Sequence, residues 1–277
     1  MSGDGLAAAA DPVAASARRV GAMVLRYVYL YRRSWPRLLD IVYWPTMQMI
    51  LWGLVTLFFV ENSSWLAQAA GVLIAGVLLW DVLFRGQLGV SVLFMEELHA
   101  RNLGHIFVSP LRIHELVLAM TAMSLLRSLI GMGVAAALAI VLYDQSIFAM
   151  GLPLIAYFAN LIVFGWAIGL MVCGLLMRYG LGAESMAWVA VFAIQPLCAI
   201  YYPVATLPEG VRWLALAIPA SHVFEGMRAV LIEGRFDLGL LAWAVGLNVV
   251  YLGLGALVFV TFFKDARRRG LLVQIGE

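Results

Sequence analysis

Three ionisable residues lie within long apolar stretches of the sequence, where charge is rare. Asp81 and Arg85 are four residues apart in one such stretch, and Arg127 lies in the next. A charged side chain is costly in lipid and normally faces protein or water, so all three are candidates for a functional site. Asp81 can pair with Arg85 on its own helix or with Arg127 on the neighbouring helix. Two interpretations stay open: an ion pair that only registers two helices, and a polar spot lining a translocation path.

Arg85 and Arg127 are expected at the same depth in the membrane. Their two stretches are consecutive and therefore antiparallel as spans. Each arginine lies roughly 10–11 residues from the connection between them, which is about 16 Å along a helix. The two guanidinium groups can therefore lie close together.

Motifs for metal binding are incomplete. His114-Glu115 begins a metalloprotease motif, but Leu118 occupies the position of the second histidine. Glu96 and His99 have the spacing of half a carboxylate-bridged site, and the apolar stretches supply almost no further ligands. We therefore expect no metal in this chain.

Signals for catalysis are equally weak. Ser221 and His222 are adjacent, but a nucleophile and its base are defined by geometry rather than by adjacency. No phosphate-binding loop is present, and the only lysine is Lys264. We expect no enzymatic activity.

The surrounding elements are those of an all-α integral membrane protein. Of the 277 residues, 64% are hydrophobic and only 12% charged, with a mean hydropathy of +0.96. A helix crosses the hydrocarbon core with about 20 apolar residues, and six stretches reach that length. The predicted spans are Ile41–Val60, Ala69–Phe94, Leu116–Tyr143, Leu152–Met177, Met186–Ala205 and Leu238–Phe263.

The segments between the spans are short. They leave no room for an ATPase or receptor domain, so any energy source must be another polypeptide. The net charge of +2 does not suggest a nucleic-acid partner. Cys173 and Cys198 both fall inside apolar spans, so no disulfide framework is expected.

The basic residues predict the orientation. Thirteen of the 18 lie on the side of the two termini, whereas only Arg212, Arg228 and Arg235 lie on the other. Basic residues near span ends stay in the cytoplasm. We therefore expect a multi-pass protein of the plasma (inner) membrane with both termini cytoplasmic.

Residues 18–37 are expected to form an amphipathic helix in the plane of the cytoplasmic headgroups, after a disordered tail of residues 1–17. Its apolar and basic sides follow helical spacing, and Trp35-Pro36 is expected to end it. The apolar side consists of Val20, Val24, Tyr27 and Tyr31, and the basic side of Arg19, Arg26 and Arg33.

Two connections are unusual. Residues 95–112, between the second and third spans, mix charges with apolar residues, which fits either a solvated loop or a short helix docking into a partner. Residues 201–235 are too apolar for an ordinary outer loop. They predict two short helices broken by Pro219, which should be re-entrant or interfacial. A seventh span is the alternative, but it would place the basic C-terminus outside.

These two connections resemble those of the ABC type-2 exporter permeases, the transmembrane subunits of ATP-binding-cassette export systems. The similarity covers nearly the whole chain from about Arg18. It is most specific in Glu97–Leu103 with Val108–Arg112, and in an outer set after the fifth span. The outer set comprises Tyr202-Pro203, Leu207-Pro208, Trp213-Leu214, Pro219 and Glu225–Arg228.

The resemblance implies a permease dimer, likewise embedded in the lipid bilayer, with two cytoplasmic ATPase subunits that carry ATP and Mg. This chain would bind no cofactor. Spans two and five would line the path, with a coupling helix between spans two and three and an outer gate. The coupling-helix residues would be Glu97, His99, Arg101, Asn102, Leu103, His105, Phe107 and Pro110. The gate residues would be Tyr202, Pro203, Pro208, Trp213, Pro219, Glu225 and Arg228.

The expected function is export of a hydrophobic or lipid-linked substrate by a permease domain of residues 38–264, followed by a basic cytoplasmic tail at 265–277. A lipid-linked glycan would need a continuous track of aromatic and polar residues along the dimer interface. An amphiphile would need an apolar track that opens sideways to the bilayer. The alternative is a membrane scaffold that recruits a cytoplasmic partner without transport.

Overall fold

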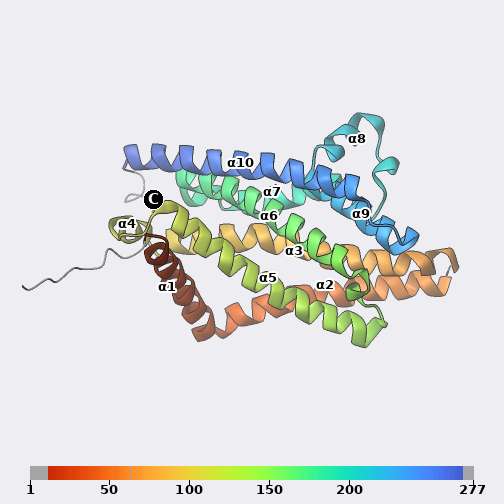
Figure 1. Cartoon of the computed structure of the whole chain (residues 1–277). Coiled ribbons are helices and arrows are strands. Elements are labelled where there is room, and N and C mark those ends of the chain that lie inside the picture. The colour runs from red at the N-terminus through yellow and green to blue at the C-terminus, as the bar shows by residue number, and fades with distance from the viewer. Residues whose placement is uncertain (1–11, 63, 271–277) are drawn as a thin grey trace, which may run out of the picture.

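The computed structural model describes residues 12–62 and 64–270, and all regular structure in these ranges is helical (Figure 1). The α-helices are α1 (Pro12–Arg33), α2 (Trp35–Asn62), α3 (Ser64–His99), α4 (Leu103–Val108), α5 (Ile113–Tyr143), α6 (Leu152–Tyr179), α7 (Ser185–Ile194), α8 (Glu209–Leu216), α9 (Pro219–Glu233) and α10 (Leu238–Arg268). Short 3₁₀ helices lie at Ile147–Met150, Gly180–Ala183, Gln195–Cys198 and Val204–Thr206.

Five helices of the described chain are long and apolar enough to cross a membrane, and a bent pair could make a sixth. These five helices, α2, α3, α5, α6 and α10, correspond to the predicted spans one to four and six. They confirm a multi-pass, all-α membrane protein.

The predicted fifth span, Met186–Ala205, is wrong in extent. The α-helical part, α7, ends at Ile194, and a 3₁₀ helix continues only to Cys198. Pro196 cannot donate the hydrogen bond that would continue the α-helix, and Ala199 turns the chain with a φ of +53°. The 14 residues from Ser185 to Cys198 cover about 21 Å, which is short for a span.

Two short helices follow, as the outer connection predicts. The axes of α8 and α9 meet at 93° across Pro219. Helix α9 is largely buried and packs against α3, α6 and α10, whereas α8 exposes Trp213. The hydroxyl of Ser221 donates to the backbone oxygen of Ala215. The Nε2 of His222 forms a hydrogen bond with the backbone oxygen of Leu216. Both side chains therefore fix the bend between α8 and α9.

The N-terminal boundaries also differ from those expected. Residues 12–17, expected within a disordered tail, form the first turns of α1, where Pro12 suits the first helical position. Trp35-Pro36 does not end this helix, since α1 ends at Arg33 and Pro36 lies in the first turn of α2. At the other end, α10 extends through the first part of the expected tail to Arg268. Residues 1–11 and 271–277 lie outside the described residues.

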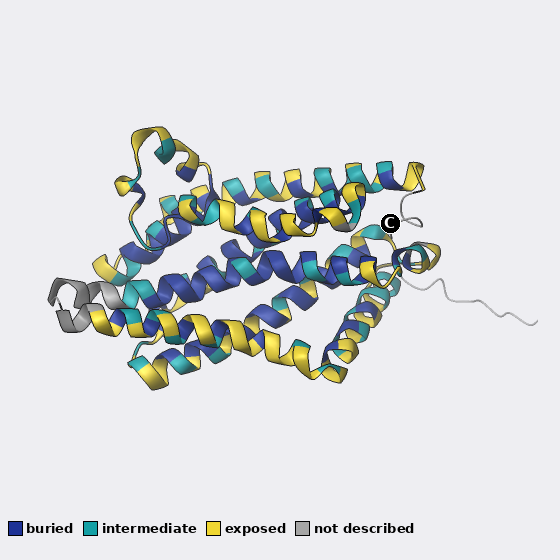
Figure 2. Cartoon of the chain, turned by 180° about the vertical axis from the view of Figure 1, so that it is seen from behind, coloured by how far each residue is buried: buried dark blue, intermediate teal, exposed yellow. Residues whose placement is uncertain are grey.

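Helix α3 is the centre of the bundle. It packs against α2, α5 and α6, and its residues 74–98 are mostly buried (Figure 2). It meets α6 at glycines on both helices, Gly86 and Gly165, so the two backbones come very close. Asp81 and Arg85 therefore lie on the most deeply buried of the five long apolar helices.

Candidate functional site

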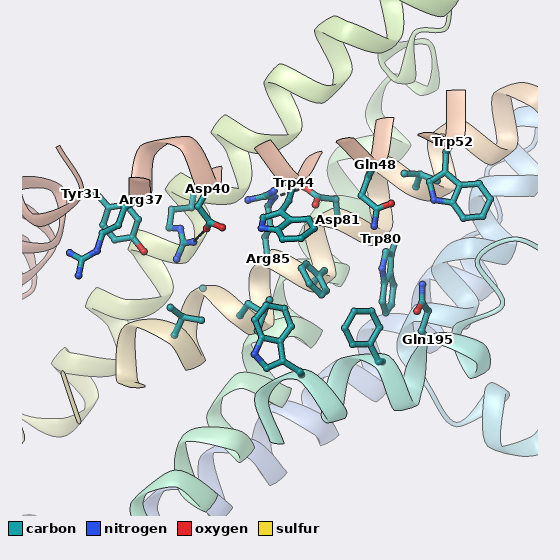
Figure 3. A pocket seen from close by; sticks show the side chains of 18 of the residues that line it. Tyr31, Arg37, Asp40, Trp44, Gln48, Trp52, Trp80, Asp81, Arg85 and Gln195 are labelled. Carbon is teal, nitrogen blue, oxygen red and sulfur yellow. Dashed lines mark hydrogen bonds and ion pairs between the residues drawn. The ribbon is translucent and has the colours of Figure 1, made fainter. Parts of the chain in front are cut away.

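A cavity of about 500 Å³ lies beside α3, with walls from α2, α3, α5 and α7 (Figure 3). It contains all three charged span residues that the sequence singles out, Asp81, Arg85 and Arg127. The sequence does not indicate which aromatic residues line the cavity, because spans rich in tryptophan and phenylalanine give no signal for the face they present. The aromatic residues in its walls are Tyr31, Trp44, Trp52, Trp80, Phe84, Trp188, Phe192 and Tyr201.

Asp81 and Arg85 pair with each other on their own helix. The Nε of Arg85 donates to a carboxylate oxygen of Asp81 at 2.6 Å, and both side chains are buried. This decides between the two partners that the spacing allows for Asp81.

Arg127 pairs with a residue that the sequence did not point out. Its Nη2 donates to Asp40 of α2 at 3.3 Å, and its guanidinium lies over the ring of Tyr31, 4.9 Å from the centroid. Asp40 immediately precedes the first predicted span, where a carboxylate is unremarkable. Burial raises the pKa of Tyr31 to about 12, so this ring is neutral beneath the cation.

Arg85 reaches the face of α5 that carries Arg127. A Cβ added at Gly131 would lie 2.9 Å from the Nε of Arg85. Gly131 is one helical turn beyond Arg127 on α5, so both guanidinium groups lie along the same face of that helix. A third pair, Arg37 with Glu96 at 3.4 Å, also lines the cavity.

Helix α4 lies in the connection of residues 95–112, for which the sequence allows either a solvated loop or a short docking helix. Leu103 is buried, and Phe107 lies in the same helix. The exposed residues of this connection are His99, Ala100, Arg101, His105, Val108, Ser109, Pro110 and Arg112. These residues form the surface that α4 and its flanks offer to a partner, and we call them the α4 surface.

Glu97 is buried and faces the chain itself rather than a partner. Its carboxylate accepts two hydrogen bonds from the guanidinium of Arg26 and one from the amide of Asn102. Glu115, on the other side of α4, is equally buried and accepts two from Arg19 and one from Ser16.

Two arginines of helix α1 bind carboxylates of the bundle instead of facing the lipid headgroups. The helical periodicity predicts a basic side in the headgroups for Arg19 and Arg26, but both form two-pronged ion pairs with buried carboxylates. The hydrogen bonds to Glu97 raise the pKa of Arg26 further above its ordinary value. Tyr27 and Tyr31 do face the bundle, as the apolar side requires. Long-range pairing is invisible in a helical periodicity, so the sequence could not indicate these contacts.

The outer segment is held together by two of the expected gate residues. Glu225 accepts a hydrogen bond from the backbone nitrogen of Val204, and Arg228 donates to the backbone oxygen of Ala199. The two side chains also pair with each other at 2.9 Å. The bend that they fix carries Tyr201, whose ring stacks on Trp52 in the cavity with centroids 4.5 Å apart.

The other expected gate residues are more peripheral. The hydroxyl of Tyr202 donates to the backbone oxygen of Pro196, and Pro203 and Pro208 precede the next two helices. Trp213 is exposed on α8, and Pro219 begins α9. The segment thus joins the end of α7 to the bundle through Glu225 and Arg228.

Among the described residues, no three histidine, cysteine, aspartate or glutamate side chains come together as a metal site would require. The chemistry of the cavity is that of a binding site: cations, carboxylates and aromatic faces enclosed between helices.

Comparison with known proteins agrees with this architecture. No curated protein sequence matches the chain. The family model of the ABC-2 type transporter matches residues 19–232, which include α4, the cavity walls and the outer segment through most of α9. The chain therefore belongs to the ABC-2 type transporter family, as a transmembrane component of an ABC transporter.

Proposed function

We propose that this chain is the membrane subunit of an ATP-driven exporter in the plasma (inner) membrane. It pairs with a second copy of itself and with two cytoplasmic ATPase subunits, which bind ATP and Mg. It moves a hydrophobic or lipid-linked substrate out of the cytoplasm or the inner leaflet by alternating access at the permease dimer interface. The cavity between α2, α3, α5 and α7 carries this proposal, because it places charged and aromatic groups together inside the spans.

The arrangement of the ends supports the orientation. The C-terminal end of α10, helix α4 and the N-terminal part of α1 all lie at one end of the bundle, and α8 lies at the other (Figure 1). The first end carries Arg101, Lys264 and Arg267, among other basic residues. By the positive-inside rule this end faces the cytoplasm. The bent pair α8 and α9 then forms the outer, re-entrant gate.

Helix α4 is proposed as the coupling helix. It is short, exposes the α4 surface, and is flanked by Glu97 and Glu115, both tied to α1. A push on α4 is thereby passed to α1, whose Tyr31 lines the cavity. This connection gives a rigid route from the cytoplasmic end to the substrate site.

The mechanism is a linkage between nucleotide and conformation. ATP binding closes the ATPase dimer, moves the docked α4 helices, and changes the relative stability of the inward-facing and outward-facing permease. Hydrolysis and product release reverse the shift. The permease has two conformations, inward-facing and outward-facing. The ATPase subunits favour one over the other through the free energy of nucleotide binding.

The test is charge reversal on the α4 surface. Arg101→Glu is expected to lower permease-dependent ATPase stimulation in the reconstituted complex about tenfold, because an interface charge-pair partner contributes 1.4 kcal/mol or more when buried. Arg101 is exposed, so the spans should fold normally.

Arg32→Glu is the matched control, since Arg32 is exposed on α1 outside the α4 surface and carries the same change of charge. Equal ATPase stimulation and transport by Arg101→Glu and the wild type would overturn the docking role of α4. Binding of an ATPase without any transport of candidate lipids in liposomes would instead favour the scaffold function.

A further inference from the structure

The arginines of the cavity have hydrogen-bond donors to spare. A guanidinium has five N–H donors. The Nε and Nη1 of Arg127 are buried and make no hydrogen bond within residues 12–62 and 64–270. In the same part of the chain, the only hydrogen bond from Arg85 is the one that its Nε donates to Asp81. Buried cationic donors without acceptors are costly, so the site suits an additional acceptor.

The two ion pairs differ in how firmly they are closed. Arg85 and Asp81 are 2.6 Å apart and both buried, so this pair is fixed. Arg127 and Asp40 are 3.3 Å apart, longer than the 2.7–2.9 Å usual between charged partners. The Arg127 side chain is 9% exposed, but that of Asp40 is 47% exposed. Asp40 is thus the replaceable partner of a buried cation.

The cavity is also polarised along its length. Figure 3 shows Arg37 and Asp40 toward one end, Asp81 and Arg85 in the middle, and Trp80 and Trp52 toward the other. Gln48 and Gln195 are the polar groups among the aromatic rings of that second end. A molecule that matches this lining has a charged head and a largely apolar body.

We propose that the cavity binds an amphiphile with an anionic head of the phosphate or carboxylate class, and that the head displaces Asp40 from Arg127. The proposal rests on the export function above and specifies its substrate. The apolar body lies against the rings of Trp80, Trp52 and their neighbours. Arg85 lies against the same face of α5, one turn beyond Arg127, with its charge paired to Asp81.

The experiment measures binding to the full chain in phosphatidylcholine nanodiscs. The probe is dodecyl phosphate with a brominated tail, which quenches tryptophans that it contacts. It is applied to a background in which every tryptophan except Trp52 and Trp80 is replaced by phenylalanine, so that the quenching reports from the cavity. Arg127→Gln is expected to weaken binding about tenfold or more, through loss of a charge-assisted hydrogen bond. Asp40→Asn is expected to tighten binding about threefold or more, because it removes the competing anion.

Arg33→Gln, an exposed arginine outside the cavity, is the control and should bind like the wild type. Opposite effects of Arg127→Gln and Asp40→Asn cannot arise from misfolding or from a merely structural pair, which both changes would weaken. Equal binding by Arg127→Gln, or weaker binding by Asp40→Asn, would overturn the proposal.

Two further probes define the head and the body. Brominated dodecyl maltoside tests a neutral sugar head, and equal affinity for it would refute the anionic head. Inorganic phosphate tests a soluble anion, and competition at the same concentration as dodecyl phosphate would refute the amphiphile. No ATPase is present, so failure here leaves α4 docking and export intact. Loss of ATPase coupling would likewise leave anion binding intact.

Discussion

Glycine at position 165 sets the distance between the two central helices. A Cβ there would lie 2.6 Å from the backbone oxygen of Leu83 and 2.9 Å from the backbone nitrogen of Gln87. Both neighbours are backbone atoms of α3, so neither can move away without shifting the helix. In lipid, where apolar burial gives little preference for helix contact, such close packing of small residues holds helices together. Gly165 therefore fixes α3, and with it Asp81 and Arg85.

Gly165→Ala is expected to destabilise the protein by about 1–3 kcal/mol, the usual cost of overpacking. The measurement is the midpoint of thermal unfolding of the purified chain in detergent. Gly246→Ala is the matched control, because nothing lies within 4 Å of a Cβ at that position of α10. This control should be neutral or slightly more stable, since alanine favours helix. Identical midpoints for both variants would show that α3 and α6 are not in close contact.

At the scale of elements, α1 acts as a strap across the ends of α3 and α5. Arg19 and Arg26 of α1 are seven residues apart, so they lie on one side of the helix and reach Glu115 and Glu97, respectively. These carboxylates flank α4. Any movement of α4 relative to the bundle must either carry α1 along or break a buried ion pair.

Glu97→Gln is expected to loosen this strap. The neutral amide cannot form the charge-assisted bonds to Arg26, so α1 should open more often from α3. Hydrogen exchange of the amides in residues 12–33 should accelerate roughly tenfold. Glu184→Gln removes an exposed carboxylate at the same end of the bundle and should leave exchange unchanged. Unaltered exchange in Glu97→Gln would mean that α1 is held by its apolar side alone.

At the scale of the whole molecule, the bundle has two distinct ends with the cavity between them. One end carries α4 and the paired arginines of α1, and the other carries the short helices fixed by Glu225 and Arg228. Both ends touch the cavity, through Tyr31 at one and Tyr201 at the other. A change at either end can therefore reach a bound molecule.

Labelling in intact cells tests the orientation of these ends. A membrane-impermeant maleimide should react with Gly210→Cys on α8 and should reach Ala100→Cys beside α4 only after the membrane is permeabilised. Both positions are exposed. The parent chain is the control, because Cys173 and Cys198 are fully buried and should stay unlabelled. The reverse pattern would invert the proposed topology.

Much of the site could be predicted from the sequence, but its pairing could not. Charge in an apolar stretch pointed to Asp81, Arg85 and Arg127, and spacing gave the Asp81–Arg85 pair as one of two choices. The partner of Arg127 is 87 positions away in the chain, and that of Arg19 is 96 away. No local pattern relates residues so distant. The predicted fifth span ends sooner than expected because the chain turns at Ala199. Pro196 by itself does not predict that turn.

The sequence by itself determined that the chain lies in a lipid bilayer, that its fold is all-α, and where most spans lie. Crossing a bilayer demands about 20 apolar residues in a row. Only the tertiary structure decided which faces of those spans meet. A span that is apolar on all sides carries no periodic signal for its packed face, since lipid is as apolar as a neighbouring helix. Close backbone contacts and ion pairs make that choice. They brought Asp40, Tyr31 and the aromatic rings to the charged residues that the sequence had already indicated.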